Sequence, residues 1–391
     1  MLFLLSLLWF KKQQKMNLFD VYSLFDLTPV KAEASYLWDD KGEKYLDLYG
    51  GHAVISVGHS HPHYVKTISE QLQNIGFYSN SVNIPIQSKV AELLGKLSGY
   101  NDYQLFLCNS GAEANENALK LASFHNGKKK VIAFSKAFHG RTSAAVAATD
   151  DASIVAPVNE TDNILFVEFN NEEALEKAFA ENEISSVIIE GIQGVGGIQI
   201  PTDSFLQKIE KLCQENNAVF ILDEIQSGYG RTGKFFAHQF SGVKPDIITT
   251  AKGMGNGFPV AGVLISPKIQ AKKGMLGTTF GGNYLACAAS LAVLQILEQE
   301  NLIQNAQEMG DYLVEQVKDL PKVKEVRSVG LMTGIELEMP CAEVRNNLLW
   351  KHKILTGNAS NKNTLRILPS LAVSKAEIDQ FVNALKTELN G

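Results

Sequence analysis

Short apolar runs alternate with amphipathic stretches between residues 104 and 265, and this alternation restricts the chain to few folds. The apolar runs are rich in Val and Ile and apolar at consecutive positions, which is typical of strands buried on both faces of a mostly parallel sheet. We predict strands at Gln104–Leu107, Lys130–Phe134, Ile164–Val167, Ser186–Ile189, Ala218–Leu222, Asp246–Thr249 and Val260–Ile265. Helical patterns lie between them at Ala112–His125, Glu172–Glu181 and Asp203–Asn216. Strands that alternate with helices indicate an α/β fold with a central sheet.

The pattern changes after Asn283. We predict helices at Tyr284–Glu300, Ile303–Leu320 and Lys375–Leu389, of which the first is largely buried and the last is amphipathic. Short strands are predicted near Val323–Val329 and Gly334–Glu338. We therefore expect a large domain over residues 46–284 and a smaller α+β domain over residues 285–391. Residues 17–45 are expected to pack with the smaller domain.

The N-terminus is apolar from Leu2 to Phe10 and continues with Lys11 and Lys12. This run is too short for a membrane-spanning helix, which needs about 20 residues. A signal peptide would carry its positive charge before the apolar run and a cleavage site after it. We expect residues 1–16 to be a non-native or disordered extension that comes from an early start codon, with a weak membrane or partner contact as the alternative.

Composition excludes several classes of protein. The chain has 36 Lys and Arg against 42 Asp and Glu, a net charge of −6, whereas nucleic-acid binding normally needs a basic face. The four cysteines are far apart and form no CxxC pair, and His52, His59, His61 and His63 come from a single region, so we expect no metal site. Few cysteines in a long chain suit a reducing compartment, so we predict a cytoplasmic protein without membrane or nucleic-acid partners.

An acid and a lysine follow two of the predicted strands. Asp223 ends the run Ala218–Leu222, and Lys252 lies between a strand and the glycines of Gly253–Gly257. Ligands bind α/β sheets at the carboxyl ends of strands. A lysine there can form a Schiff base with an aldehyde cofactor, and an acid can pair with a pyridinium nitrogen, which together indicate pyridoxal phosphate chemistry. Taken singly, the acid could be a helix cap and the lysine a surface residue.

Two further segments suit the same cofactor. Ser110 and Gly111 open the predicted helix at Ala112, and backbone N–H groups at such an N-terminus bind phosphate, although a simple cap explains Ser110 equally well. The segment Phe138–Thr142 offers an aromatic ring for stacking and an arginine for a carboxylate, the alternative being a core Phe and a surface Arg. Gly228–Gly233 matches a dinucleotide pattern without the expected helix or distant acid, so we interpret it as a glycine-rich active-site or surface loop.

With these motifs in order, the chain resembles the class-III pyridoxal-phosphate aminotransferases of fold type I from about Leu18 to the C-terminus. Within that family it is most similar to enzymes that act on N-acetylornithine. The motifs that carry the resemblance are Gly58-His59 with His61-Pro62, Ser110-Gly-Ala-Glu-Ala-Asn115, Phe138-His-Gly-Arg-Thr142, Asp223-Glu-Ile-Gln226, Gly230-Arg-Thr-Gly-Lys-Phe235, Ala251-Lys-Gly-Met-Gly-Asn-Gly257, Thr279-Phe-Gly-Gly-Asn283 and Leu365-Arg-Ile-Leu-Pro369.

The resemblance implies a role for each site residue. Lys252 would carry pyridoxal 5′-phosphate, and Asp223 would pair with its ring nitrogen. The remaining cofactor contacts would be Ser110, Gly111, Ala112, Phe138, His139, Gln226 and, from a neighbouring subunit, Thr279, so that a homodimer is implied. Arg366 would hold the α-carboxylate of the keto acid and Arg141 a second carboxylate. Glu190 would pair with Arg366 when that arginine is idle.

The implied reaction moves the ω-amino group of an N-acylated ornithine to 2-oxoglutarate, giving a semialdehyde and glutamate, in arginine biosynthesis. Two departures from the family pattern put the acyl group in doubt. Many relatives have a second acid shortly after the equivalent of Glu190, where this chain has Val195, and Ser81–Pro85 lacks the aromatic residues often found there. N-Succinylornithine is therefore an alternative to N-acetylornithine. Ornithine, 4-aminobutyrate and a non-catalytic cofactor-binding protein are the more distant alternatives.

Overall fold

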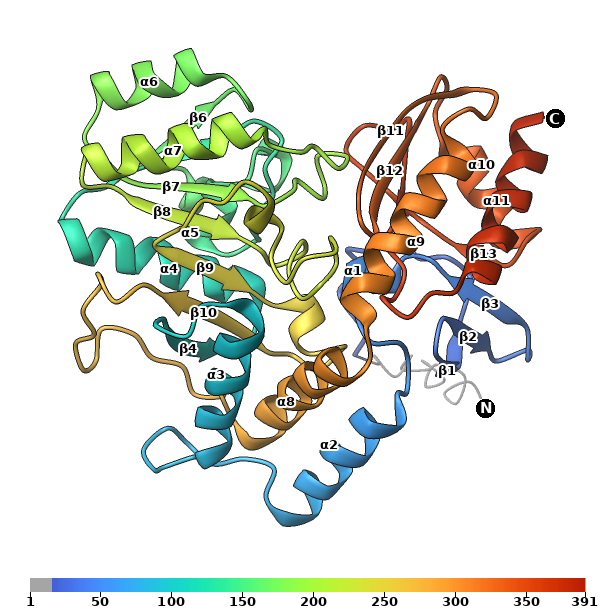
Figure 1. The fold of residues 1–391 in the computed structure, drawn as a ribbon, viewed down its shortest axis with the longest axis horizontal. Helices are drawn as coiled ribbons and strands as arrows, with labels where there is room; N and C mark the ends of the chain where they lie inside the picture. The colour runs from blue at the N-terminus through green and yellow to red at the C-terminus, as the bar shows by residue number, and fades with distance from the viewer. Residues whose placement is uncertain (1–15, 391) are drawn as a thin grey trace, which may run out of the picture.

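A seven-stranded sheet forms the centre of the larger unit (Figure 1). The computed structural model describes residues 16–390. The strand order is β4-β10-β9-β8-β7-β5-β6, with bounds β4 Gln104–Cys108, β5 Lys130–Phe134, β6 Ile164–Val167, β7 Ile184–Glu190, β8 Val219–Asp223, β9 Ile247–Thr250 and β10 Ala261–Ile265. Neighbouring strands from β9 to β6 run parallel, whereas β10 is antiparallel to both β4 and β9.

Helices cover both faces of this sheet. Consecutive side chains of a strand point to opposite faces, so neighbouring residues of β8 pack against different helices. Val219 and Ile221 pack in one cluster with helix α4 (Gly111–Asn126), while Phe220 and Leu222 pack on the other face with α6 (Glu172–Glu181) and α7 (Asp203–Glu215). The side chains of Ser110, Asn171 and Thr202 cap these three helices. The predicted α/β architecture with a mostly parallel sheet is confirmed.

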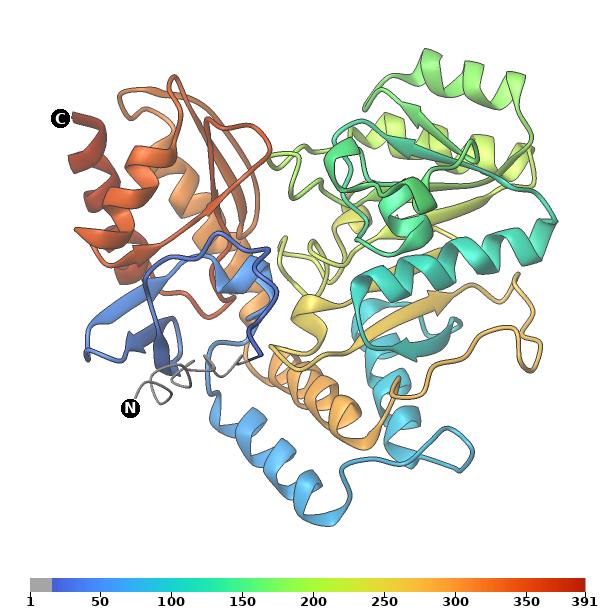
Figure 2. The same ribbon diagram turned by 180° about the vertical axis from the view of Figure 1, so that it is seen from behind.

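The smaller unit contains two further sheets (Figure 2). One has the order β11-β12-β15-β14, with bounds β11 Val323–Val329, β12 Met332–Leu337, β14 Gly357–Asn358 and β15 Thr364–Ile367. Helices α9 (Leu302–Val317), α10 (Ala342–Trp350) and α11 (Lys375–Asn390) pack beside it. The other sheet joins β1 (Pro29–Glu33), β2 (Tyr36–Asp39) and β3 (Lys44–Asp47) to β13 (Ile354–Leu355). The N-terminal segment therefore lies against the C-terminal part of the chain.

Three long helices pack together below the large sheet in Figure 1. Helix α8 (Tyr284–Gln299) packs against α2 (Pro62–Asn74) and α3 (Pro85–Ser98). Both α2 and α3 begin with proline, whose fixed φ suits the first turn of a helix. The predicted division into residues 1–16, 17–45, 46–284 and 285–391 stays a prediction, and residues 1–15 of the predicted extension lie outside the described residues. Within residues 16–390, no helix is long and apolar enough to cross a membrane.

The glycine-rich stretch Gly228–Gly233 lies inside the protein, which excludes the surface loop that its sequence also allowed. Tyr229, Arg231 and Thr232 are all buried. Arg231 donates to the carbonyl oxygens of Leu331 and Pro369, both of which belong to the smaller unit. The stretch thus fastens the two units to each other, and the buried guanidinium is matched by carbonyl groups, as buried charges require.

Candidate active site

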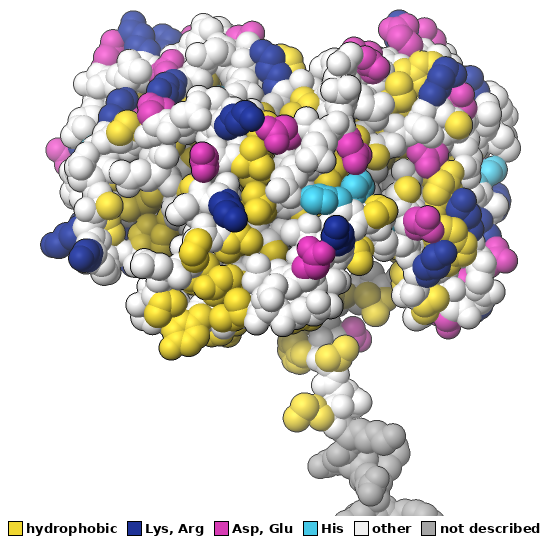
Figure 3. Space-filling view, turned by 60° about the horizontal axis from the view of Figure 1, so that its bottom comes forward, with side chains coloured by type: hydrophobic (Ala, Val, Ile, Leu, Met, Phe, Trp, Pro, Cys, Tyr) yellow, Lys and Arg dark blue, Asp and Glu magenta, His cyan; other side chains and the backbone are white. Residues whose placement is uncertain are grey.

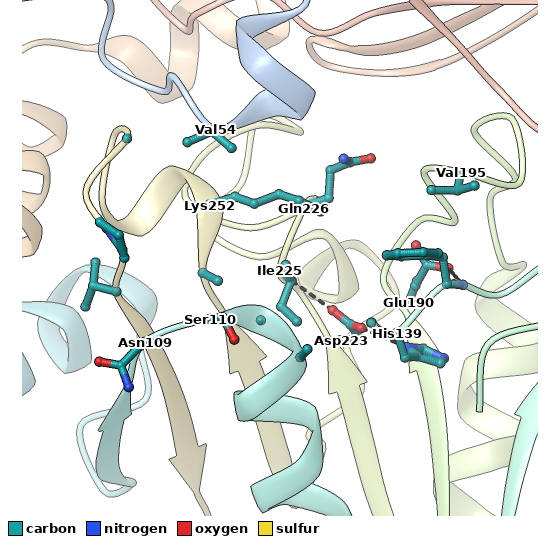
Figure 4. A pocket seen from close by; sticks show the side chains of 18 of the residues that line it. Val54, Asn109, Ser110, His139, Glu190, Val195, Asp223, Ile225, Gln226 and Lys252 are labelled. Carbon is teal, nitrogen blue, oxygen red and sulfur yellow. Dashed lines mark hydrogen bonds and ion pairs between the residues drawn. The ribbon is translucent and has the colours of Figure 1, made fainter. Parts of the chain in front are cut away.

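A cavity of about 340 Å³ opens at the carboxyl ends of the central strands (Figure 4). Parallel strands end at the same edge of a sheet, and ligands bind α/β proteins there. The lining includes Ser110, Gly111, Ala112, Phe138, His139, Glu190, Asp223, Gln226 and Lys252. The structure therefore brings together nine of the site residues that the sequence predicted, from segments more than a hundred residues apart.

Asp223, the last residue of β8, is buried and held by three donors. Its Oδ2 accepts from Asn115 Nδ2 at 2.8 Å and contacts His139 Nδ1 at 2.7 Å, and its Oδ1 accepts from the backbone N–H of Ile225 at 3.0 Å. These contacts fix the orientation of the carboxylate at the floor of the cavity, where a cationic ring nitrogen could be recognised.

Lys252 follows β9 and points across the cavity toward Gln226 (Figure 4). Its backbone adopts a left-handed conformation with φ +42°, which is uncommon for a residue with a side chain and clusters at functional sites. Although part of Lys252 faces the cavity, desolvation of its ammonium group lowers its pKa, against the opposing effect of Asp223 and Glu190. A lysine with a lowered pKa is more readily available as a neutral amine.

The N-terminus of α4 leaves space for an anion. The Ser110 side chain accepts from the backbone N–H of Glu113, so this residue is a helix cap as well as part of the lining. At Gly111, a Cβ atom would lie 2.9 Å from two side-chain atoms of Ile225, and at Gly140 it would lie 2.6 Å from Ala112 Cβ. Larger residues would close this part of the cavity, where exposed N–H groups and the helix dipole favour a phosphate.

Gln226 and His139 present polar atoms whose partners are missing among the described residues. The buried Gln226 Oε1 and His139 Nε2 have no hydrogen bond within residues 16–390. Buried polar groups are normally satisfied, so such atoms point to a ligand or water. With the aromatic ring of Phe138 on the wall, an acid at the floor, a lysine opposite and an anion site at one end, the cavity fits pyridoxal 5′-phosphate.

Glu190 and Arg366 are both buried and do not form an ion pair in the structure. Glu190 accepts from the backbone N–H groups of Phe138 and Gly194, each at 3.0 Å, and burial raises its pKa to about 7. Arg366, on β15, donates to Asn358 O and, at 2.9 Å, to Tyr49 Oη. Its partners within residues 16–390 are a carbonyl and a hydroxyl, and no ion pair of this part of the chain includes it, although the residue is only 4% exposed. A buried cation without an anion suits a substrate carboxylate.

Arg141 and Thr279 lie outside the cavity lining. Both residues are exposed. Hydrogen bonds from Ser153 lower the pKa of Asp151, and the charge of Arg141 contributes, so Arg141 is close to that surface carboxylate. The predicted roles of Arg141 and Thr279 stay predictions, the second because it depends on a neighbouring subunit.

The sequence did not reveal the residues that hold the predicted ones in place. Asn115 lies within a recognised motif, but its bond to Asp223 joins positions far apart in the chain.

Tyr49 accepts a hydrogen bond from Arg366, and the carbonyl group of His52 accepts one from Gln226. No motif at Tyr49 or His52 pointed to a site. A run of two glycines at Gly50 and Gly51 was the one available signal, since it permits an unusual backbone turn.

Comparison with known proteins agrees with this geometry. Residues 20–389 match the family model described as aminotransferase class-III. Acetylornithine aminotransferases of Nitrosomonas europaea and Bacillus subtilis are each 39% identical to the chain, and the alignments cover 94% and 95% of it and 95% and 97% of those proteins.

Solved structures show the same fold. An ornithine aminotransferase from Toxoplasma gondii, described with partial occupancy of PLP at its active site, is 26% identical with a TM-score of 0.87, covering 94% of this chain and 91% of that one. A Bacillus anthracis aminotransferase is 29% identical with a TM-score of 0.86, covering 93% of each chain. The fold-type prediction is thereby confirmed, and the chain belongs to the class-III aminotransferase family.

Proposed function

We propose that this aminotransferase moves the ω-amino group of an N-acylated ornithine to 2-oxoglutarate, giving the semialdehyde and glutamate, as a step of arginine biosynthesis. The observation that carries the substrate is the similarity, over nearly the whole chain, to proteins named acetylornithine aminotransferase. The buried Arg366 without a carboxylate partner supports a dicarboxylate keto acid as the second substrate.

The cofactor is pyridoxal 5′-phosphate, and when bound it draws electrons from the carbon atom that carries the amine. The N-terminus of α4 with Ser110, Gly111 and Ala112 would hold the phosphate. Asp223 would hold the protonated ring nitrogen, with Asn115 and His139 keeping its carboxylate oriented. Phe138 would lie against the ring, and Gln226 Oε1 would gain the partner that it lacks.

Lys252 would be the group that moves the proton. As a neutral amine it would take a proton from the amine-bearing carbon as a base and then release that proton as an acid. Burial favours the neutral form, which is why desolvation of this lysine matters for the reaction. The two substrates use the same cavity in turn, which predicts ping-pong kinetics.

Arginines hold the substrate carboxylates because a guanidinium binds a carboxylate through two parallel hydrogen bonds. Arg366 would hold the α-carboxylate of 2-oxoglutarate, and Arg141 a second carboxylate. The idea that Glu190 neutralises Arg366 during the other half-reaction stays a proposal, since Glu190 bonds backbone N–H groups and a partial proton uptake near pH 7 would weaken it as a counter-charge.

A substrate panel tests this function. N-Acetylornithine, N-succinylornithine, ornithine and 4-aminobutyrate are each supplied with 2-oxoglutarate, and glutamate formation is measured. We expect an N-acylated ornithine to give the highest kcat/KM, with the acyl group decided by the first two compounds. A highest value for ornithine or 4-aminobutyrate would contradict the proposed substrate. Cofactor binding without turnover of any amine would indicate a non-catalytic protein.

We also propose a homodimer with shared active sites. Figure 3 shows hydrophobic side chains gathered on the lower face of the molecule. Helix α2, the loop between α2 and α3, and the segment before α8 carry exposed apolar residues, namely Leu72, Phe77, Tyr78, Val82 and Phe280. The rings of Phe77 and Phe280 lie 5.4 Å apart. Large exposed apolar patches mark interaction surfaces. Phe280 adjoins Thr279, the residue that the family resemblance assigns to the neighbouring subunit's phosphate.

A cytoplasmic location is proposed on chemical grounds. Cys108, Cys213, Cys287 and Cys341 are free thiols in the structure and all are buried. A long chain that forms no disulfide from its cysteines suits a reducing compartment.

A further inference from the structure

The hydroxyl group of Tyr49 lies between Arg366 and His52. Arg366 Nη2 donates to Tyr49 Oη at 2.9 Å, and Tyr49 Oη lies 2.6 Å from His52 Nδ1. Because the hydroxyl oxygen already accepts from the guanidinium, its own hydrogen is available for His52. The two rings also pack with centroids 4.8 Å apart. The direction of the Tyr49 hydroxyl is therefore fixed from both sides.

Burial keeps both groups in the neutral state that the contact needs, and the surrounding cations reinforce this effect on His52 alone. Part of the His52 ring is open to solvent, yet desolvation lowers its pKa, and the cations Arg366, Lys252 and Arg345 lower it further. Burial raises the pKa of Tyr49 against the opposite effect of Arg366 and Arg345. A neutral imidazole can accept through Nδ1, and a protonated phenol can donate to it.

The pair stands on a backbone turn that few residues adopt. Gly50, Gly51, His52 and Ala53 all have positive φ, at +54°, +55°, +69° and +63°, so that α1 (Gly50–Ala53) is a left-handed turn. Glycine takes this conformation easily, whereas a residue with a side chain is strained there. Asp47 Oδ1 holds the start of the turn through the N–H groups of Tyr49 and Gly50. The turn also presents the carbonyl of His52 to Gln226 Nε2 at 3.1 Å, beside Val54 on the cavity wall.

A glycine on the other side makes room for the Tyr49 ring. Gly357 pairs with Arg366 across β14 and β15. A Cβ atom at Gly357 would lie 2.0 Å from Tyr49 Cε2, a distance that no pair of non-bonded carbon atoms tolerates. The ring thus occupies the space of the missing side chain, directly beside the arginine that it contacts.

We propose that Tyr49, fixed by His52, is a positioning residue that orients Arg366 for the carboxylate of a dicarboxylate keto acid and so determines specificity for that substrate. This inference rests on the proposed function of Arg366. A carboxylate partner would cancel the charge of the guanidinium, whereas a neutral hydroxyl orients it and leaves the charge for the substrate. The amine donor, which reacts through its remote amino group, does not need this arrangement.

The test measures glutarate, an unreactive dicarboxylate, binding to the holoenzyme by calorimetry. Tyr49→Phe should raise its Kd by roughly tenfold to a hundredfold, the value of one lost hydrogen bond to a charged group. His52→Asn, which tolerates the left-handed turn, should act in the same direction. Tyr103→Phe is the matched control, because Tyr103 also loses one hydroxyl contact, to Pro245 O, away from the cavity. Its Kd should stay unchanged.

Two further variants separate positioning from a structural role. Gly357→Ala displaces the Tyr49 ring without removing a polar group and should also raise the Kd for glutarate. His52→Gly relieves the strained backbone, so its Tm should equal or exceed that of the wild type while glutarate binds more weakly.

Steady-state kinetics complete the test. In Tyr49→Phe, KM for 2-oxoglutarate should rise while KM for the amine donor stays unchanged. Wild-type glutarate affinity in Tyr49→Phe, or an equal rise of both KM values, would overturn the inference. Because glutarate binding needs no amine donor, it is decided separately from the identity of that donor: a failed substrate panel would leave this result standing.

Discussion

At the scale of single residues, the proposed chemistry depends on the amine of Lys252. We expect Lys252→Ala to lower kcat by at least about a thousandfold, since the group that transfers the proton is gone. The measurement is glutamate formation from the best amine donor at saturating cofactor. Lys136, exposed on a loop outside the cavity lining, provides the control variant Lys136→Ala with wild-type activity. Near-normal turnover in Lys252→Ala would show that another lysine serves the reaction.

The raised pKa of Glu190 gives a pH dependence of stability with a defined sign. Burial raises this pKa from 4.5 to about 7, so the folded protein binds the proton more tightly than the unfolded chain does. The free energy of unfolding should therefore fall as the pH rises from about 4.5 to about 7, by up to roughly 3 kcal/mol. Urea unfolding of cofactor-free protein at several pH values measures it.

The control for this prediction is Glu190→Gln, which cannot titrate. Its amide would face one of the N–H groups of Phe138 and Gly194, so we expect Glu190→Gln to be less stable than the wild type at low pH, without the pH dependence that ionisation of Glu190 causes. The difference between the two proteins should shrink as the pH rises. A difference that stays constant from pH 5 to pH 8 would contradict the raised pKa.

At the scale of elements, the packing at the start of α4 depends on the absence of a side chain at Gly111. A methyl group at Gly111 would lie 2.9 Å from two atoms of Ile225, so Gly111→Ala must displace this neighbour. We expect the Kd for pyridoxal 5′-phosphate to rise by about tenfold or more. Ile225→Ala removes the colliding atoms, so the double variant should regain cofactor affinity relative to Gly111→Ala alone. Additive losses in a double-mutant cycle would contradict the proposed collision.

Most elements of the large sheet could be predicted from the sequence, because strands buried on both faces leave continuous apolar runs. The strands β5 and β6 have the predicted bounds, Asp223 is the last residue of β8, and Lys252 lies just after β9. The antiparallel direction of β10 was not visible, since direction depends on a connection and not on a local pattern. The hairpin of β1 to β3 was missed because its residues alternate weakly and pair with the distant β13.

In the candidate site, too, residues within local motifs could be predicted, whereas contacts between distant segments could not. Residues that belong to compact motifs, such as Ser110 and Gly111, could be assigned from their own neighbourhood. The contacts of Arg366 could not, because Tyr49 lies on a segment near the other end of the chain and the turn that presents it has no sequence signature beyond two glycines. The same holds for Arg231, whose partners Leu331 and Pro369 lie in the smaller unit.

At the scale of the whole molecule, the exposed apolar face predicts assembly. Phe280 is 60% exposed, and a charge there would be buried without a partner if two copies meet on this face. We expect Phe280→Asp to shift the protein from dimer to monomer in analytical ultracentrifugation and to lower kcat, because Thr279 would no longer reach a neighbouring cavity.

Phe124 gives the matched control for that experiment. It is 56% exposed on α4, on a different element from the apolar face, so Phe124→Asp should leave the sedimentation of the protein unchanged. A Phe280→Asp protein that sediments like the wild type, or a wild-type protein that is monomeric, would contradict the proposed dimer.

The parallel pairing of β3 with β13, in which Leu46 lies opposite Ile354, has a consequence for how the chain is made. During synthesis the hairpin that contains β3 leaves the ribosome long before its partner exists. The seven-stranded sheet, complete by residue 265, can form meanwhile. Contacts between distant parts of a chain are slow to form and leave partly folded intermediates. We therefore expect the outer edge of β3 to stay open in each newly made molecule until β13 has been synthesised.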